Sequence, residues 1–305
     1  MAPIAVFGTV FVDLKGFPFG KYLPTGRNVG SVLTMHGGVS RNIAENFANI
    51  GADVLFVTML EDSALGQSVR VRLMERGVGL KYSVNAENGM GLYMAIFDET
   101  GALAASISKQ PDFRALENLI DREGDAIMEA CGNVVLEIDL IESIAEKVFR
   151  LAKSHKKEVY AVVGNMNVIL RRPDFLRDTS LFILNEIEAG SLLFRTLDPQ
   201  KPEEVLAILK QETAKRGIRR MIITLGEYGS VCYDSVSGES GIIRAVPTKA
   251  VDTTGAGDAF FTAAVAAWEK GATLCRAAEL GSILASRTIQ TKENVCPADR
   301  EFLIL

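Results

Sequence analysis

Short apolar runs alternate with amphipathic stretches over most of the chain. Near the start, Ile4–Val12 predicts a first strand, and Val54–Thr58 predicts the next one. Between these strands, apolar residues recur at helical spacing: Ile43, Phe47 and Ile50. Ser40 offers an N-cap for this helix, and Gly51 stands where a C-terminal glycine belongs. The pattern therefore predicts a strand–helix–strand unit.

From about residue 112, helical and strand patterns alternate regularly. Helices are predicted at Ser143–Ser154 and Pro202–Arg216, and a helical final third at Ala256 to about Thr288. Four apolar runs have the look of buried parallel strands: Val134–Ile138, Val159–Val163, Leu181–Leu184 and Met221–Leu225. Such alternation predicts a doubly wound α/β fold, in which ligands bind beyond the carboxyl ends of the strands.

Two further regions have a β pattern without intervening helices. Leu92–Phe97 and Leu103–Ile107 flank a loop that contains glycine, which predicts a hairpin. Gly16–Gly30 is rich in glycine, proline and aromatic residues. We expect these regions to form a small flap outside the main sheet. Ser230–Asp234 and Ser240–Ala245 predict a second hairpin near the sheet edge.

Composition narrows the class of protein. The chain has 305 residues, of which 48% are hydrophobic and 23% charged, and a formal net charge of −5. These values are typical of a globular protein and argue against a nucleic-acid partner. The four cysteines contain no CxxC pair, so structural zinc and a disulfide framework are not expected. No apolar stretch is long enough for a membrane span, and we expect a cytoplasmic protein without a membrane partner.

The strongest chemical signal is the segment Asp252-Thr-Thr-Gly-Ala-Gly-Asp258, which an apolar helix follows at once. Small residues at a helix start leave backbone N–H groups free to bind an anion. An aspartate in the first turn beside them can accept a proton from an attacking hydroxyl. An anion hole and a base are what phosphoryl transfer to an alcohol requires. The alternative is a glycine-rich turn in which Asp258 is an ordinary cap.

A second group of residues suits an alcohol with several hydroxyls. Gly37 and Gly38 precede a helix and allow a close approach of backbone to ligand. Asn42 offers a donor and an acceptor, and Asp13 follows the first strand as an acceptor for a diol. Loop glycines, a cap and a surface acid are the competing interpretation.

Two strand ends carry further candidates. Asn185 and Glu188 directly follow a predicted strand, and Glu188 is suited to hold Mg²⁺ through water. The alternative is an acidic helix N-terminus. Thr224, Gly226 and Gly229 form a strand end that can pass under a nucleotide or make a tight turn. No G-x-G-x-x-G opens a helix after a strand, and Gly16–Lys21 lacks the full P-loop pattern.

In this order, these motifs resemble the ribokinase-like (PfkB) family of carbohydrate and nucleoside kinases over nearly the whole chain. The resemblance implies ATP-dependent phosphorylation of a primary hydroxyl. It implies one domain over residues 1–305, with a ribokinase-like three-layer α/β/α doubly wound sheet and a small β lid formed by segments of about 14–35 and 90–110. Because lids in this family often pair, it also implies a homodimer through the lid.

The resemblance also implies roles for the matching residues. Asp258 would be the base, and the amides of Gly255, Ala256 and Gly257 would form the anion hole. Asp13, Gly37, Gly38 and Asn42 would hold the hydroxyls of the acceptor. Asn185 and Glu188 would serve the phosphates and Mg²⁺, and Thr224, Gly226 and Gly229 would line the ATP nucleotide. Asp252 and Thr254 would belong to a site for a monovalent cation such as K⁺.

Within the family, Gly37–Asn46 and Ser237–Gly241 most resemble pseudouridine kinases. Two positions depart from the family pattern. Gly164-Asn165 replaces a common Asp-Pro or Asp-Asn, and Ile183-Leu184 replaces a common Lys-Pro. Both departures lie near the expected phosphate and metal region.

The leading hypothesis is a kinase for the 5′-hydroxyl of a ribosyl compound, with pseudouridine as the first acceptor. A sugar kinase for ribose, fructose or a keto-sugar acid stays open, because the lid segments do not reveal the acceptor. A nucleoside- or nucleotide-binding regulator with little turnover also stays open, on the ground of the two departures.

Overall fold

The computed structural model describes residues 2–304 of the chain. Its centre is a sheet that has nine strands within those residues. From one edge to the other they are β13 (Ser240–Ile243), β12 (Ser230–Asp234), β11 (Arg220–Thr224), β10 (Leu181–Asn185), β9 (Val159–Val162), β8 (Val134–Glu137), β1 (Ile4–Phe7), β4 (Val54–Leu60) and β5 (Ser83–Asn85). The strands from β11 to β5 run parallel, and β12 and β13 form an antiparallel edge.

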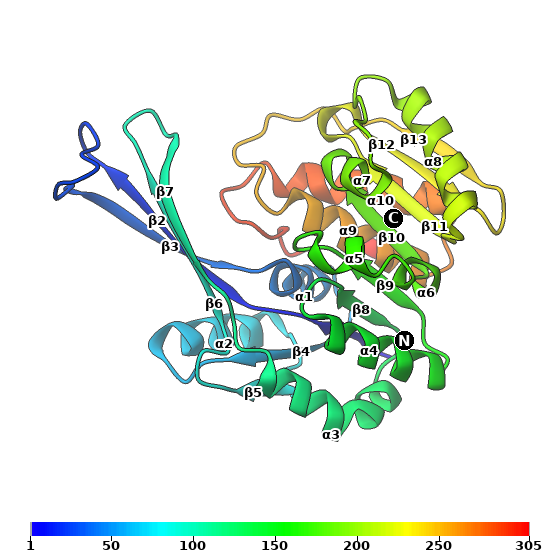
Figure 1. Ribbon diagram of the computed structural model, residues 1–305, viewed down its shortest axis with the longest axis horizontal. Helices are drawn as coiled ribbons and strands as arrows, with labels where there is room; N and C mark the ends of the chain where they lie inside the picture. Colours follow the sequence, from blue (N-terminus) through cyan, green and yellow to red (C-terminus); the bar gives the residue numbers. More distant parts are fainter. Residues whose placement is uncertain (1, 305) are drawn as a thin grey trace.

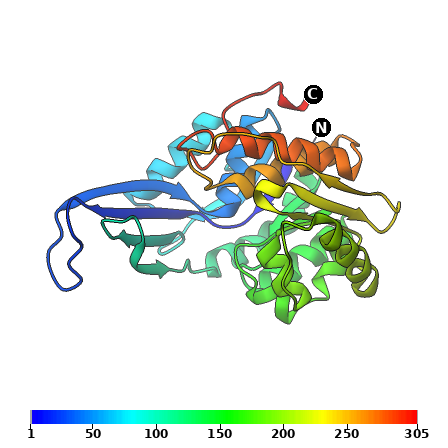
Figure 2. The same ribbon diagram turned by 90° about the horizontal axis from the view of Figure 1, so that it is seen from above.

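Helices cover both faces of this sheet (Figures 1 and 2). One face carries α1 (Val39–Asn49), α2 (Ala64–Arg76), α9 (Ala256–Glu269) and α10 (Leu274–Thr288). The other carries α3 (Arg114–Ala130), α4 (Glu142–Ser154), α5 (Asn167–Arg171), α6 (Phe175–Asp178), α7 (Glu186–Leu193) and α8 (Pro202–Arg216). Side chains of β1 alternate between the two layers, since Val6 faces α1 and Phe7 faces the opposite core. The predicted α/β architecture is therefore confirmed.

A second sheet projects from this body (Figure 1). We call it the small sheet, and its order is β3 (Gly30–Gly37), β2 (Phe11–Pro18), β6 (Gly91–Phe97) and β7 (Leu103–Lys109). The predicted hairpin of β6 and β7 is confirmed. Val32, Met94 and Ile107 share one face of the small sheet and are 72%, 40% and 70% exposed. Asp13 lies on the other face, because side chains alternate along β2.

Several local predictions were wrong. The expected first strand Ile4–Val12 is divided, because the chain leaves the main sheet after Phe7 and enters the small sheet at Phe11. Asp13 therefore lies within β2 rather than after a strand. By contrast, the helical final third is confirmed, as two helices that are separated by a turn at Gly271, where φ is +83°. The sequence analysis did not find α2 or α3.

The N-cap prediction at Ser40 was also wrong. Helix α1 starts at Val39, and its N-cap is Gly38, with φ of +96°. The Ser40 hydroxyl instead donates to Glu137 Oε2 at 2.7 Å. The glycine expected at the other end is confirmed, because Gly51 has φ of +81° just beyond the helix. Within residues 2–304, no helix is both long enough and apolar enough to cross a membrane.

Candidate active site

The start of α9 has the backbone form that an anion site needs. Gly255 is the N-cap with φ of +81°, and a Cβ atom there would lie 2.0 Å from the Asn294 carbonyl oxygen, so only glycine fits. Among residues 2–304, the amides of Gly255 and Gly257 have no acceptor, whereas the Ala256 amide donates to Thr253 at 3.2 Å. A Cβ at Gly257 would meet open space. Two of the three predicted amides are thus free to bind a ligand.

Asp258 lies in the first turn of α9 beside these amides. Asn42 Nδ2 donates to its Oδ2 at 2.6 Å. The residue keeps some exposed surface, but burial of its carboxyl group raises the pKa of Asp258 to about 7. The Asn42 hydrogen bond and the Arg41 charge oppose this rise, and the Glu137 and Glu188 charges add to it. A carboxyl group that titrates near neutrality can both accept and release a proton.

Of the residues predicted to hold hydroxyls, Asn42 contacts Asp258, and Asp13 lies beside Gly37, just before α1. A Cβ atom at Gly37 would lie 2.8 Å from Asp13 Oδ2, so the glycine leaves room for that carboxylate. Burial raises the pKa of Asp13, and the Lys15 and Arg41 charges oppose the rise. Asn42 Oδ1 is buried and has no hydrogen-bond partner among the described residues. Because an unpaired buried oxygen is costly, this atom is available to a ligand donor.

The sequence analysis missed Glu137 at the end of β8. Its buried carboxylate accepts from the Thr9 amide at 3.1 Å and from the Ser40 hydroxyl at 2.7 Å. Burial raises the pKa of Glu137. An acidic residue at the carboxyl end of a buried parallel strand was the available signal, but Val134–Ile138 looked like a continuous apolar run. We call Asp13, Gly37, Asn42, Glu137 and Asp258 the α1–α9 cluster.

Asp139, two residues further on, was missed as well. Its Oδ1 accepts from the amides of Val168 and Ile169 at 2.9 and 3.2 Å, at the start of α5. Its Oδ2 is buried without a partner in residues 2–304. Burial raises the pKa of Asp139 to about 6, and the charges of Glu137 and Glu188 add to the rise.

A second group of predicted residues lies at the ends of β10 and β11. Asn185 and Thr224 are register partners on these strands. Asn185 caps α7, since its Oδ1 accepts from the Glu188 amide at 2.9 Å while Glu188 Oε2 accepts from the Asn185 amide at 2.9 Å. Burial raises the pKa of Glu188. The alternative interpretation, an acidic helix N-terminus, is therefore also present, because Asn185 and Glu188 form a capping box at the start of α7.

The two glycines after β11 complete this second group. Gly226 and Gly229 have φ of +57° and +99° on either side of the single turn η1 (Gly226–Tyr228). A Cβ atom at Gly229 would lie 2.0 Å from the Ile243 carbonyl oxygen. The backbone here therefore requires glycine. We call Asn185, Glu188, Thr224, Gly226 and Gly229 the β10–β11 cluster.

The predicted cation residues make local contacts. Asp252 Oδ1 accepts from the Thr254 amide at 2.8 Å, and this bond lowers the pKa of Asp252. The ionised carboxylate is a hard oxygen ligand of the kind that suits such a cation. The described part of the chain contains no group of three or more His, Cys, Asp or Glu side chains that could hold a metal. A protein-only metal cage is therefore not found there.

The structure gives a physical reason for the departures from the family pattern. A Cβ atom at Gly164 would lie 2.8 Å from Glu137 Oε1, so glycine makes room for that carboxylate. Asn165 Oδ1 accepts from the Asn167 amide at 2.9 Å, next to the start of α5. Ile183 and Leu184 are buried at 6% and 2% exposure within β10. Gly164 therefore makes room for Glu137, and Ile183 and Leu184 are part of the buried core of the sheet.

Comparisons with known proteins show the family to which the chain belongs. The sequence profile of the pfkB family carbohydrate kinases matches residues 1–298. The guanosine-inosine kinase of Exiguobacterium acetylicum is 32% identical over 295 residues, which are 96% of this chain and 96% of that protein. The pseudouridine kinase of Escherichia coli K12 is 24% identical over 270 residues, which are 88% of this chain and 84% of that protein.

A solved structure shows the same fold. Arabidopsis thaliana ribokinase, complexed with ribose and ATP, matches 99% of this chain and 97% of its own with a TM-score of 0.84 and 22% identity. The ribokinase-like architecture expected from the sequence is therefore confirmed.

Proposed function

The chain belongs to the pfkB family of carbohydrate kinases and is an ATP-dependent kinase; from this premise we propose that it phosphorylates the 5′-hydroxyl of a ribonucleoside. Guanosine and inosine are the first candidates, because a guanosine-inosine kinase is 32% identical over almost the whole chain. Pseudouridine is the second, because Gly37–Asn46 resembles the corresponding stretch of pseudouridine kinases, one of which is 24% identical.

The Asn42–Asp258 hydrogen bond carries the proposal. It brings a hydroxyl-binding amide within 2.6 Å of a carboxylate that titrates near neutrality. Asp13 and the open Oδ1 of Asn42 accept hydrogen bonds from the ribose hydroxyls, and Gly37 and Gly38 allow the ribose to approach the backbone closely. Asp258 then accepts the proton of the attacking 5′-hydroxyl.

The start of α9 stabilises the charge of the transferred group. The amides of Gly255 and Gly257 have no hydrogen-bond acceptor among the described residues, and the helix dipole adds to their effect on an anion. The Ala256 amide contributes after it gives up its bond to Thr253. The β10–β11 cluster binds the ATP, with Thr224, Gly226 and Gly229 along the nucleotide and Asn185 at the phosphates.

Two metal ions fit residues of the site. Glu188, whose Oε2 accepts from the Asn185 amide in the capping box, suits Mg²⁺ bound through water. Asp252 and Thr254 suit K⁺. Bound Mg²⁺ neutralises charge on the phosphates.

We further propose that the small sheet acts as a lid on a single kinase domain and that two copies pair through it. The exposed face that carries Val32, Met94 and Ile107 is apolar and lies opposite Asp13, so pairing leaves the acceptor face open. Light scattering should show a dimer that the Ile107→Lys substitution converts to a monomer. The cytoplasmic location stays a prediction from the sequence.

The experiment measures ADP release from Mg-ATP, with and without potassium. The acceptors are guanosine, inosine, pseudouridine, uridine, ribose and fructose, and 5′-deoxyinosine is the matched control that lacks the reacting hydroxyl. We expect turnover with a nucleoside and none with 5′-deoxyinosine. Turnover with ribose or fructose alone would overturn the nucleoside proposal while the kinase remains. Nucleoside binding without ADP release from any acceptor would favour a regulator.

A further inference from the structure

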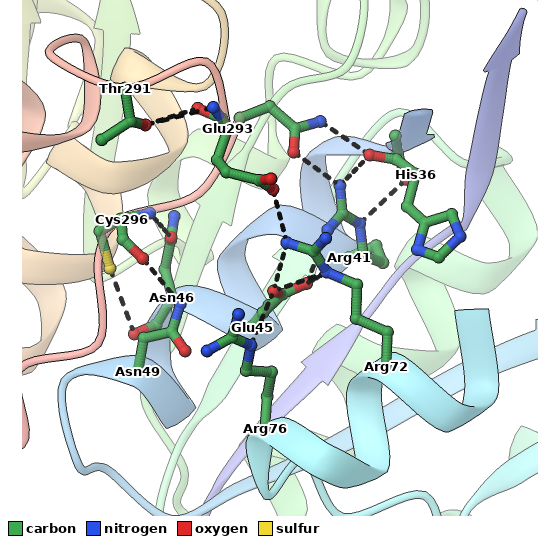
Figure 3. Close-up of polar contacts among 12 residues, drawn as sticks. His36, Arg41, Glu45, Asn46, Asn49, Arg72, Arg76, Thr291, Glu293 and Cys296 are labelled. Carbon is green, nitrogen blue, oxygen red and sulfur yellow. Dashed lines mark hydrogen bonds and ion pairs between the residues drawn. The ribbon is translucent and has the colours of Figure 1, made fainter. Parts of the chain in front are cut away.

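Arg41 on α1 is the largest fully buried side chain among the described residues. Its Nη1 pairs with Glu45 at 2.7 Å, and its Nε donates to the Gly37 carbonyl at 3.3 Å. Its Nη2 donates to the His36 carbonyl and, at 3.1 Å, to Asn294 Oδ1 (Figure 3). Every branch of the guanidinium is therefore bound, as a buried arginine requires.

The ion pair with Glu45 does not explain this arrangement. Glu45 is itself fully buried, but its carboxylate also binds Arg72 at 2.9 Å, and Arg76 stands 3.7 Å away. Glu45 would thus keep cationic partners without Arg41. Buried ion pairs add little net stability, because removing charges from water is costly. What distinguishes Arg41 from the other two arginines is its set of bonds to the His36 and Gly37 carbonyls and to Asn294.

These bonds begin at His36 and Gly37, where β3 leads into α1, and we call this junction the hinge of the small sheet. His36 and Gly37 are the last residues of β3, through which the chain returns from the small sheet to α1. The His36 carbonyl accepts a second bond from Asn294 Nδ2 at 2.7 Å. Gly38 follows with φ of +96°. Two side chains from distant parts of the sequence therefore hold one of the connections between the small sheet and the body.

The same asparagine reaches the start of α9 through its backbone. Asn294 is 4% exposed, and its carbonyl oxygen lies 2.0 Å from where a Cβ of Gly255 would stand. Gly255 begins the turn whose free amides form the proposed anion hole. The residue after Arg41, Asn42, holds Asp258 in the same turn. Two adjacent residues of α1 thus connect to the start of α9. Arg41 connects the hinge to Gly255 through Asn294, and Asn42 binds Asp258 directly.

Resting on the proposed function, we propose that Arg41 and Asn294 form a positioning clamp that couples the hinge of the small sheet to the anion hole at the start of α9. When the small sheet closes over an acceptor, the clamp transmits the position of β3 to Gly255. Neither residue touches the reacting atoms. A shift of about 1 Å at a reacting centre is enough to slow a reaction about a hundredfold.

The first test compares kcat with KM in two variants. Arg41→Lys keeps the charge beside Glu45 but cannot reach two carbonyls and an amide at once. Asn294→Ala removes the side-chain bonds and leaves Arg41 with its other partners. In both variants we expect kcat to fall about tenfold to a hundredfold, while KM for ATP changes less than about threefold. The double variant should be no slower than about the slower single variant, because the two residues act as one unit.

Arg76→Lys is the matched control, since Arg76 also approaches Glu45 but contacts neither the hinge nor Asn294. We expect its kcat to stay near that of the wild type. Unfolding temperatures are measured for all variants. A loss of stability in the clamp variants with unchanged kcat per folded molecule would show a purely structural role and overturn the proposal.

The second test needs no turnover. Hydrogen exchange of the backbone amides in residues 252–258 is measured without ligands, and we expect it to be about fivefold or more faster in Asn294→Ala than in the wild type and in Arg76→Lys. Equal exchange in all three, or additive losses of kcat in the double variant, would overturn the clamp. If the wild type phosphorylates no acceptor, the proposed function fails, and hydrogen exchange alone decides about the clamp.

Discussion

The α1–α9 cluster and the β10–β11 cluster lie at the carboxyl ends of the same sheet, but they are assembled in opposite ways. In the first, Asn42 binds Asp258 across 216 positions of sequence and Ser40 binds Glu137 across 97. In the second, Asn185 and Glu188 are three positions apart and cap each other. The first cluster therefore depends on the packing of distant segments, whereas the Asn185–Glu188 part of the second forms within a single helix turn.

The clusters also differ in how far their buried oxygens are paired. Burial is the largest cause of the raised pKa of Asp258, of Glu137 and of Glu188. Asn42 Oδ1 in the first cluster and Asp139 Oδ2 near it lack partners among the described residues. The β10–β11 cluster satisfies its own polar groups through the cap. We infer that the α1–α9 cluster is prepared at a cost in stability for the reaction, whereas the β10–β11 cluster is a stable platform for the nucleotide.

The substitution with the largest expected effect on kcat replaces Asp258, the carboxylate of the α1–α9 cluster that accepts the proton in our proposal. Asp258→Asn should lower kcat about a thousandfold, because no carboxylate remains to accept the proton. KM for ATP should stay within about threefold of the wild-type value. Steady-state kinetics measure both, with the exposed Asp178→Asn as a matched control. Near-normal turnover would remove Asp258 from the role of base.

The next substitution tests whether the α1–α9 cluster binds the nucleoside and the β10–β11 cluster binds ATP. Asp13→Ala removes an acceptor of ribose hydroxyl bonds, so kcat/KM for the nucleoside should fall about a hundredfold. KM for ATP should hardly change, since Asp13 is not part of the β10–β11 cluster. Initial rates with each substrate varied in turn give the two constants. An equal loss for ATP would contradict the division.

A smaller effect tests the close packing around Glu137. Gly164→Ala places a Cβ 2.8 Å from Glu137 Oε1, so the carboxylate must shift. We expect kcat to fall about tenfold and stability to fall by about 1–3 kcal/mol. Gly20→Ala is the control, because no atom lies within 4 Å of the added Cβ. Denaturant unfolding and kcat are measured on both variants, and equal results would show that Glu137 tolerates displacement.

The smallest effect concerns the local cluster. Glu188→Gln keeps an acceptor for the Asn185 amide, so α7 should remain capped and stability should change by less than about 0.5 kcal/mol. The Mg²⁺ concentration for half-maximal rate should rise about fivefold, because the carboxylate charge is lost. Glu186→Gln, in the same turn but outside the capping box, should leave this concentration unchanged. An unchanged magnesium requirement in Glu188→Gln would exclude a role for Glu188 at the metal.

This contrast also explains what the sequence could predict. The patterns of the later strands, the hairpins and the Asn185–Glu188 spacing depend on neighbours within a few positions, and the structure has these elements. Ser40 was misjudged because its hydroxyl binds a carboxylate 97 positions away instead of capping its own helix. Glu137 and the Arg41–Asn294 contacts were missed because they exist only after distant strands and helices pack together.

The identity of the acceptor is also difficult to predict from local sequence motifs. In our proposal the acceptor is selected by side chains on one face of the small sheet, such as Asp13 and its register partner Tyr93. The stretch Gly37–Asn46, which resembles pseudouridine kinases, meets that face only at Gly37, which has no side chain. Similarity to a guanosine-inosine kinase is therefore the main support for the acceptors that we propose.

The pH dependence of kcat/KM for the nucleoside tests the central claim most directly, with Mg²⁺ in excess. Asp258 must be ionised to accept a proton, so the wild-type rate should rise tenfold per pH unit and level off above about pH 7, in line with a pKa of about 7. Asn42→Ala removes a bond that lowers this pKa, so its acid limb should move to higher pH. A flat wild-type profile between about pH 5.5 and 8.5, or a limb that Asn42→Ala leaves in place, would contradict the account.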